Sequence, residues 1–298
     1  MSRPTWKGVA RTFGLLLGMA LLAAAVVYAL WGVDWTVLAA AEPSGFVLLA
    51  AAVLANLVLT GLLFWAITLS FDASPPVGPG RMVGLVCVSS LLNYLPLPRA
   101  GLVGRSAYLK WRHGLPLRQS VVIMAVVLAL AVAVFGVTAA MLLAFDDTAG
   151  WIAMAAALLA LTLATGPVAR RLLRRPVRWG WLWAPLRTLD LLATAARLWL
   201  AFALLGQPID FEQAVLIGAA SLLVKLAGLT PNGLGLSEWL VAALTPVLAP
   251  VETATAAAAA VLDRAAEVLV VLVAGGVGLV MVQKGSGPTD EVRGLRMK

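Results

Sequence analysis

The residues best suited to chemistry are charged side chains that interrupt long apolar segments. There are eight of them: Arg99, Arg105, Arg197, Lys225, Glu238, Asp263, Arg264 and Glu267. If these segments lie in a bilayer, each charge near its centre costs about 2.5–3.5 kcal/mol on insertion scales. We therefore expect these side chains to face one another or a polar cavity.

Three of these residues can pair within one helix. Asp263 and Glu267 share a helical face at the i,i+4 spacing, and Arg264 reaches Glu267 at i,i+3. One interpretation is that these three residues pair with one another, stabilise a helix bundle and have no further role.

The other cations have fewer acids near them in the sequence and suit the binding of a phosphate, whose oxygens a guanidinium holds with two parallel hydrogen bonds. The candidate phosphate cradle consists of Arg99, Arg105, Arg197 and Lys225. Arg99 and Arg264 are expected at its core, and Glu238 is expected to hold an arginine when no phosphate is bound. The alternative for Arg105 is a place in the cytoplasmic fringe of the protein.

The composition indicates which elements must position these residues. Of 298 residues, 62% are hydrophobic and 12% are charged, whereas a soluble domain carries about 25% charged residues. A membrane span takes roughly 20 apolar residues. The sequence predicts spans at 12–33, 45–69, 119–145, 151–169, 188–206 and 253–283. The links between them are short, so we expect no soluble domain.

The charges in these links predict the orientation. The links 34–44, 146–150, 207–212 and 246–252 contain acids and no Lys or Arg, whereas the N-terminal segment, the other links and the C-terminal tail are basic. By the positive-inside rule, both termini are cytoplasmic. The net charge of +8 therefore indicates orientation and attraction to anionic headgroups, rather than binding of nucleic acid.

Segment 82–110 is expected to enter and leave the membrane on the same side. Its uncharged run at 82–95 has 14 residues, too few to cross, and prolines and glycines follow it. If it did cross, every later link would invert and the arginine cluster at 170–178 would lie outside. We therefore predict a re-entrant hairpin that enters from the cytoplasm.

Segment 214–249 is expected to be the opposite hairpin. Two short apolar arms flank the helix-breaking sequence at 230–235, and the links on both sides contain only acids. Irregular backbone at membrane depth is tolerated only where it is buried in protein or lines a wet cavity. Two hairpins that meet would imply such a cavity.

Together these elements predict an all-α polytopic membrane protein with six full spans and two re-entrant helical hairpins. Residues 1–150 form the first half and residues 151–298 the second, and each half has two spans, a hairpin and one more span. Because each half crosses three times, the halves are inverted relative to each other. That is the plan of secondary transporters, in which broken helices meet near the midplane.

A group of aromatic and basic residues is typical of a membrane interface. Its members are Trp179, Trp181 and Trp183, with Arg178 and Arg187. We predict that they form a belt at the inner leaflet.

Motifs at both hairpins, and one residue beyond them, resemble a known family. In the first hairpin, Asn93 is followed by Pro98-Arg99-Ala100-Gly101 and then by Arg105. In the second, Pro231-Asn232-Gly233-Leu234-Gly235-Leu236-Ser237-Glu238 is similar to a Pro-Gly-Gly-Leu-Gly-x-x-Glu pattern, and Arg264 is similar to an arginine in a last long helix. These features resemble the flippase-like transmembrane region of the lysylphosphatidylglycerol synthetase family, which also occurs as stand-alone membrane proteins.

The resemblance covers nearly the whole chain and implies movement of a lipid, or a lipid-linked headgroup, between leaflets. It adds Asn93 and Asn232 to the candidate substrate-binding residues. The chain departs from the family at Leu102, where the family's first motif has an acid. Aminoacylation in that family belongs to a soluble domain, which we do not expect here.

Three classes of function fit these features. We expect a lipid translocator in the cell (inner, cytoplasmic) membrane that is not an enzyme. A non-transporting membrane partner or assembly factor is one alternative. Another is an intramembrane enzyme that uses Asp263 and Glu267 on a lipid. With one histidine in the chain, we expect neither a metal nor a cofactor. The expected partners are membrane lipids, anionic or linked to a polyprenyl or terpenoid chain; an oligomer is compatible, and no nucleic acid is expected.

Overall fold

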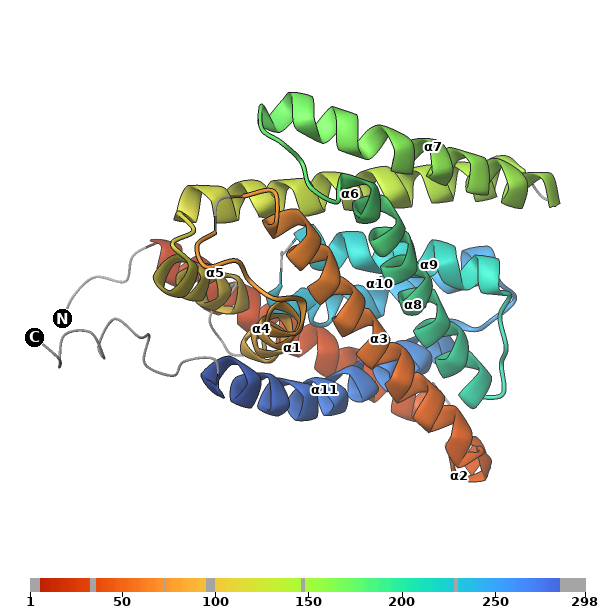
Figure 1. The fold of residues 1–298 in the computed structure, drawn as a ribbon. Coiled ribbons are helices and arrows are strands. Elements are labelled where there is room, and N and C mark those ends of the chain that lie inside the picture. Colours follow the sequence, from red (N-terminus) through yellow and green to blue (C-terminus); the bar gives the residue numbers. More distant parts are fainter. Residues whose placement is uncertain are drawn as a thin grey trace, which may run out of the picture.

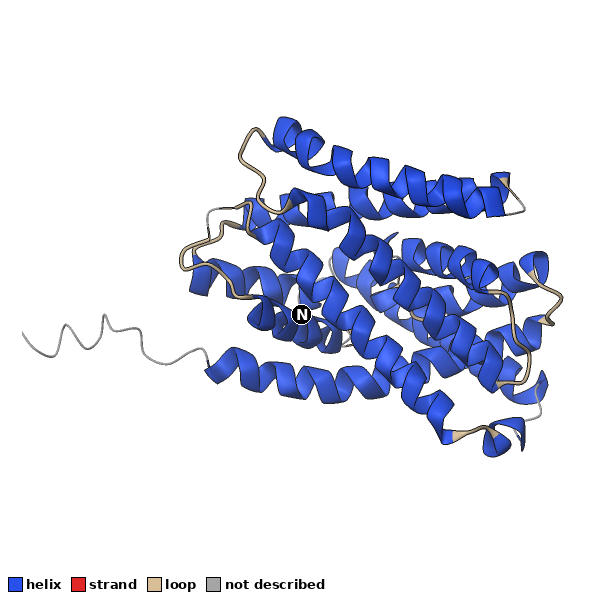
Figure 2. Ribbon diagram, turned by 45° about the vertical axis from the view of Figure 1, so that its right-hand side comes forward, coloured by secondary structure: helices blue, strands red, loops and turns tan. Residues whose placement is uncertain are grey.

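The computed structural model describes residues 6–32, 36–71, 73–94, 100–145, 148–227 and 230–284. Every regular element within these ranges is a helix, which confirms the predicted all-α class (Figures 1 and 2). The α-helices are α1 (Trp6–Gly32), α2 (Thr36–Ala40), α3 (Pro43–Thr68), α4 (Pro79–Leu92), α5 (Ala100–His113), α6 (Leu117–Ala144), α7 (Thr148–Leu173), α8 (Trp183–Leu204), α9 (Phe211–Ala227), α10 (Leu236–Leu248) and α11 (Thr253–Lys284). Two 3₁₀ turns, η1 (Gly180–Leu182) and η2 (Pro231–Gly233), precede α8 and α10.

Four of these helices have both the length and the apolar composition of a membrane span, namely α3, α6, α7 and α11. Helix α8 has 22 residues, which is also long enough, but it carries Arg187, Asp190 and Arg197. The chain is therefore a multi-pass helical membrane protein.

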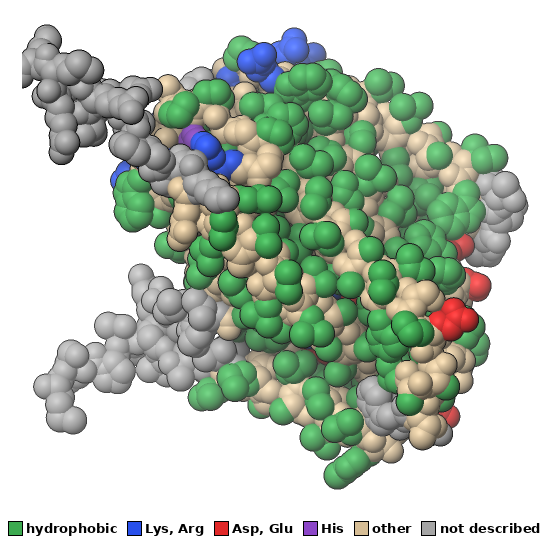
Figure 3. Space-filling model, turned by 60° about the horizontal axis from the view of Figure 1, so that its bottom comes forward, with side chains coloured by type: hydrophobic (Ala, Val, Ile, Leu, Met, Phe, Trp, Pro, Cys, Tyr) green, Lys and Arg blue, Asp and Glu red, His purple; other side chains and the backbone are tan. Residues whose placement is uncertain are grey.

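Charged side chains lie at opposite ends of the bundle, with a hydrophobic band between them (Figure 3). We call one end the basic end; it carries Arg81, Lys110, Arg112, Arg118, Arg170, Arg171, Arg174, Arg175 and Arg178. The acidic end carries Glu42, Asp210, Glu212 and Glu252. This separation is the arrangement expected of a bundle whose two ends face different sides of a membrane.

Each segment predicted to turn back consists of two short helices in contact, α4 with α5 and α9 with α10 (Figure 1). Helix α4 begins near Arg81 and α5 ends at His113, both at the basic end, whereas α9 begins at the acidic end and α10 ends there. Gly114, at φ +63°, follows α5 in the left-handed conformation common after a helix C-terminus. The two helix pairs therefore approach the middle of the bundle from opposite ends.

The turn between α9 and α10 fits closely against α1. Asn232, Gly233 and Gly235 all have positive φ values, of 51°, 69° and 75°, and Pro231 opens the turn. A Cβ atom on Gly235 would lie 2.4 Å from the Cβ of Leu21, so only glycine fits here. The indole Nε1 of Trp239 also donates a hydrogen bond to the Leu21 carbonyl at 2.9 Å.

Helix α11 lies between the two short pairs. It contacts α4 of the first pair and α10 of the second, and it also packs against α1, α3 and α8. Helix α8 packs along α3 and reaches α9. Charged residues on α8 and α11 are thereby placed where the two pairs meet.

Candidate functional site

Six ionisable side chains gather where α8, α9, α10 and α11 meet, and we call them the charge cluster. They are Arg197 of α8, Lys225 of α9, Glu238 of α10, and Asp263, Arg264 and Glu267 of α11. The most exposed of these side chains retains only 17% of its accessible area. All six are among the residues selected from the sequence, and the structure brings them together.

Glu267 is the central anion of the charge cluster. Its Oε2 lies 2.7 Å from Nη2 of Arg197 and 2.9 Å from Nζ of Lys225. Its Oε1 lies 3.3 Å from Nη1 of Arg264, one helical turn away. One buried carboxylate therefore joins cations from three helices.

Arg197 is held by a fork of hydrogen bonds. Its Nε donates to Oδ1 of Asp263 at 2.8 Å and its Nη2 donates to Oδ2 at 2.9 Å. Its Nη1 donates to Oδ1 of Asn56 on α3 at 3.2 Å. Paired bonds of this kind are the strong form of an arginine–carboxylate contact and fix the orientation of the guanidinium.

Arg264 connects α11 to the start of α10. Its Nε pairs with Oε1 of Glu238, and its Nη2 donates to the hydroxyl of Ser237 at 2.7 Å. The charge cluster thus contains three cations and three carboxylates, and their formal charges cancel. This balance is what keeps six buried ionic groups tolerable in an apolar bundle.

The turns of the two short pairs meet at one oxygen atom of Glu267. Tyr94, just after α4, donates its hydroxyl to Oε1 at 3.0 Å, and Asn232 of η2 donates its Nδ2 to the same Oε1 at 3.2 Å. The first pair enters from the basic end and the second from the acidic end. Glu267 therefore joins both turns to α11.

Neutral polar groups extend the charge cluster toward α3. Nδ2 of Asn56 donates to Oδ1 of Asp190 at 2.7 Å, and the Thr60 hydroxyl donates to that oxygen at 2.8 Å. Asp190 also pairs with Arg187 at 2.6 Å. We did not select these residues or Tyr94 from the sequence. The available signals were Asn56, the only amide in the predicted span 45–69, and the i,i+3 spacing of Arg187 and Asp190.

Two other predicted site residues make contacts outside the charge cluster, and a third falls outside the described residues. Arg105, on α5, contacts Phe64 and Met124 and, among the described residues, makes no hydrogen bond or ion pair to the charge cluster. Asn93 accepts a hydrogen bond from the backbone N–H of Gly101 at 3.0 Å, which ties the end of α4 to the start of α5. Arg99, expected at the core of the phosphate site, lies outside the described residues, as does Pro98.

The predicted interfacial belt is wrong for two of its members. Trp179 and Trp181 are 45% and 57% exposed, as an interface requires, but Trp183 is only 1% exposed. Arg187 is also buried, paired with Asp190 and stacked on the ring of Phe135. The reason is that α8 begins at Trp183 and turns inward, so its first turn belongs to the core.

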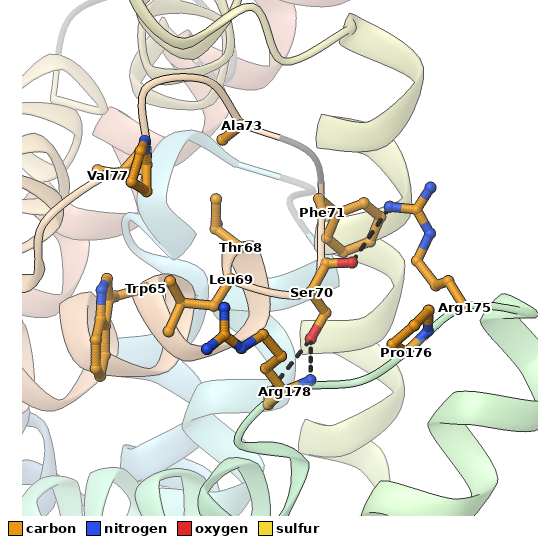
Figure 4. Close-up of a pocket in the computed structure, with 11 residues that line it drawn as sticks. Trp65, Thr68, Leu69, Ser70, Phe71, Ala73, Val77, Arg175, Pro176 and Arg178 are labelled. Atoms are coloured by element: carbon orange, nitrogen blue, oxygen red, sulfur yellow. Dashed lines mark hydrogen bonds between the residues drawn. The ribbon is translucent and has the colours of Figure 1, made fainter.

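An open pocket of about 430 Å³ lies at the basic end, between the end of α3 and the link from α7 to α8 (Figure 4). Arg175 and Arg178 line it on either side of Ser70, and Trp65 and Phe71 provide aromatic walls. Nη1 of Arg175 donates to the Ser70 carbonyl at 3.2 Å. The pocket combines cationic and apolar surface, as a phospholipid headgroup and its glycerol region require.

An anion that entered the charge cluster would give this neutral set of groups a net negative charge. In this structure its groups bind one another, which is the mutual pairing considered for Asp263, Arg264 and Glu267. An incoming anion would replace a carboxylate at a guanidinium rather than fill an unused position. Within the described ranges, no three His, Cys, Asp or Glu side chains gather in a way that could hold a metal ion.

The fold and this site define a multi-pass helical membrane protein with a buried ionic centre. Comparison with known families is specific: the model of the Lysylphosphatidylglycerol synthase TM region matches residues 15–275. The chain belongs to this family, which confirms the resemblance noted at the hairpins and places it among membrane proteins that act on lipids. No curated protein and no solved structure matches the chain.

Proposed function

We propose that this protein is a lipid translocator, which moves a lipid or lipid-linked headgroup between the leaflets without changing it chemically. One observation carries the proposal: the turns of two helix pairs from opposite ends both bind Oε1 of Glu267. A group held at this point can be reached from either end when one pair moves away. Midplane sites at the meeting point of broken helices are typical of transporters that work by alternating access.

The packing supports an inverted repeat of two halves with six spans, α1, α3, α6, α7, α8 and α11. Helix α3 packs on α4 as α8 packs on α9, and α1 packs on α11 as α7 packs on α6. In such a repeat, α7, α8, α9 and α11 of the second half correspond to α1, α3, α4 and α6 of the first. Each of these two pairs of contacts is therefore equivalent under the repeat. The two short pairs are then the re-entrant hairpins of the two halves.

The substrate is proposed to carry a phosphate. Arginine stays charged inside a protein, so Arg197 and Arg264 need an anion in every state of the cycle. A phosphate oxygen would compete with Glu238 for Arg264, and departure of the lipid would let Glu238 return. This exchange uses groups already in the bundle and requires neither metal nor nucleotide.

The basic end is proposed to face the cytoplasm, with both termini on that side. The pocket lined by Arg175 and Arg178 would then lie at the level of the inner headgroups. Anionic headgroups are attracted to such a surface. We propose this pocket as the place where a lipid headgroup first meets the protein.

Reconstitution of the pure protein tests the function. Liposomes containing a fluorescent phosphatidylglycerol are treated with an impermeant quencher, which reaches only the outer leaflet. Protein-containing vesicles are expected to lose nearly all their fluorescence, because lipid from the inner leaflet keeps arriving outside. Loss that stops at about the outer-leaflet share, as in protein-free vesicles, would instead indicate a non-transporting membrane protein.

A further inference from the structure

Arg105 is a buried cation that pairs with no carboxylate among the described residues. It lies on α5 and is 9% exposed. Its guanidinium carbon lies 3.6 Å from the centre of the Phe64 ring, and its Nη2 donates to Sδ of Met124 at 3.1 Å. In the described part of the chain, no carboxylate oxygen lies within 4 Å of it. A thioether and an aromatic face are weak partners for a full charge.

A small cavity adjoins this guanidinium. It measures about 10 Å³ and is lined by residues of α3, α4, α5 and α6. Ser120, on α6, also lines it, and the Ser120 hydroxyl is buried without a hydrogen-bond partner among the described residues. Two further polar residues line it, Ser106 and Thr68, and the Thr68 hydroxyl already donates to the Phe64 carbonyl at 2.7 Å. An unmatched cation and an unused hydroxyl donor therefore line the same small cavity.

The surroundings favour an anion there. Arginine cannot escape the cost of burial by losing its proton, and an unpaired buried charge is among the most destabilising features of a protein interior. Ser120 lies in the first turn of α6, which begins at Leu117, where the helix dipole adds positive potential. The guanidinium, the hydroxyl and the positive end of the helix dipole all favour a negatively charged ligand.

The size of the cavity decides which anion fits. About 10 Å³ is room for one particle the size of a water molecule, and a chloride ion, which is somewhat larger, fits once the lining side chains move slightly apart. A phosphate group, with five heavy atoms, is too large. We propose that Arg105 and Ser120 bind one halide ion, chloride in the cell, at a site separate from the charge cluster.

This ion would hold α5 of the first helix pair against α6, since the ligands of the ion come from these two helices. Thr68 lines both this cavity and the open pocket at the basic end, so the two spaces are neighbours at this residue. The role of Arg105 is then to hold the anion, not the lipid.

Thermal unfolding of the purified protein tests the site. Sodium chloride and sodium bromide are expected to raise the midpoint by a few degrees over sodium gluconate at equal ionic strength, and the effect should saturate. Sodium phosphate and a short-chain phosphatidylglycerol should not reproduce it. Equal midpoints in chloride and gluconate, or a response to phosphate or the lipid without one to chloride, would overturn the proposal.

Two variants locate the effect. Arg105→Met should abolish the chloride dependence, whereas Arg118→Met, which removes one exposed arginine at the same end, should retain it. Leu102→Asp is the second variant and serves if Arg105→Met fails to fold: its carboxylate would lie one turn from Arg105 on the cavity wall. The folded Leu102→Asp protein should no longer respond to chloride. A chloride response that survives in either Arg105→Met or Leu102→Asp contradicts the site.

In crystals of the wild-type protein grown with bromide, an anomalous peak beside Arg105 is expected, and its absence would also contradict the site.

Discussion

At the scale of single residues, Glu267 is the group on which the ionic centre depends. Replacing it with Gln removes the charge that Arg197, Lys225 and Arg264 share. Losing one partner of a buried ionic group costs about 3–5 kcal/mol. We therefore expect Glu267→Gln to lower the unfolding midpoint strongly in detergent, measured by circular dichroism on heating.

The matched control for this variant is Glu252→Gln. Glu252 is an exposed carboxylate at the acidic end, and surface substitutions of this kind stay within about 0.5 kcal/mol. If both variants unfold at the same temperature as the wild type, the carboxylate of Glu267 does not hold the cluster together.

Sequence reasoning was effective for residues whose partners are close in the chain. The spacing of Asp263, Arg264 and Glu267 predicted that they share one helix face, and the contact between Arg264 and Glu267 is present. Asn56 and Asp190 are 134 residues apart, so no local pattern could pair them. Their contact depends on how α3 packs along α8, which periodicity does not encode.

At the scale of helices, close packing of the first pair depends on Gly101. A Cβ atom at this position would lie 2.0 Å from the Ser89 carbonyl oxygen, which is backbone and cannot rotate away. We expect Gly101→Ala to separate α5 from α4 and to cost about 3 kcal/mol, the upper part of the range for overpacking. Chemical unfolding measures this loss.

The control for Gly101→Ala is Gly136→Ala on α6. No heavy atom lies within 4 Å of a Cβ built on Gly136, and alanine is the better helix former. That variant should be as stable as the wild type or slightly more so. A Gly101→Ala protein with wild-type stability would mean that α4 and α5 do not pack this closely.

The turns of the two helix pairs should be joined by a short thiol cross-linker. Tyr94→Cys and Asn232→Cys are introduced into a Cys87→Ala background, since Cys87 is the only cysteine. Because the native side chains reach the same oxygen of Glu267, a short bis-methanethiosulfonate should link them and stop lipid transport. Cross-linking that leaves transport unchanged would show that the turns need not separate.

Helix breaks were predictable because their cause is local. Proline and glycine at 230–235 cannot continue a helix, and the chain turns there. The direction in which a helix face points was harder to predict from the sequence. Trp183 has the composition of an interfacial residue, but it is buried because α8 turns into the bundle at that residue.

At the scale of the whole molecule, the separation of charge predicts the orientation. We expect Arg118→Cys, at the basic end, to be protected from an impermeant maleimide in intact cells, and Glu252→Cys, at the acidic end, to react. Both positions are exposed, and both variants carry Cys87→Ala. The opposite labelling pattern would invert the proposed topology.

The separation of basic and acidic links was visible in the sequence because the positive-inside rule depends only on composition. The meeting of the two turns at Glu267 was expected in outline, as hairpins that approach one another. Its atomic form was not, because a single carboxylate oxygen shared by Tyr94 and Asn232 depends on tertiary packing.

The central claim is that lipid passes through the charge cluster, and the rate of leaflet exchange in Arg264→Lys tests it most directly. Lysine keeps the charge but loses the fork that binds Glu238 and Ser237. The protein should remain folded and move lipid about tenfold more slowly, equivalent to roughly 1.4 kcal/mol in the barrier. Arg118→Lys changes an exposed arginine at the basic end and should transport at the wild-type rate. Wild-type transport by Arg264→Lys, or an equal loss in both variants, would contradict a lipid path through the cluster.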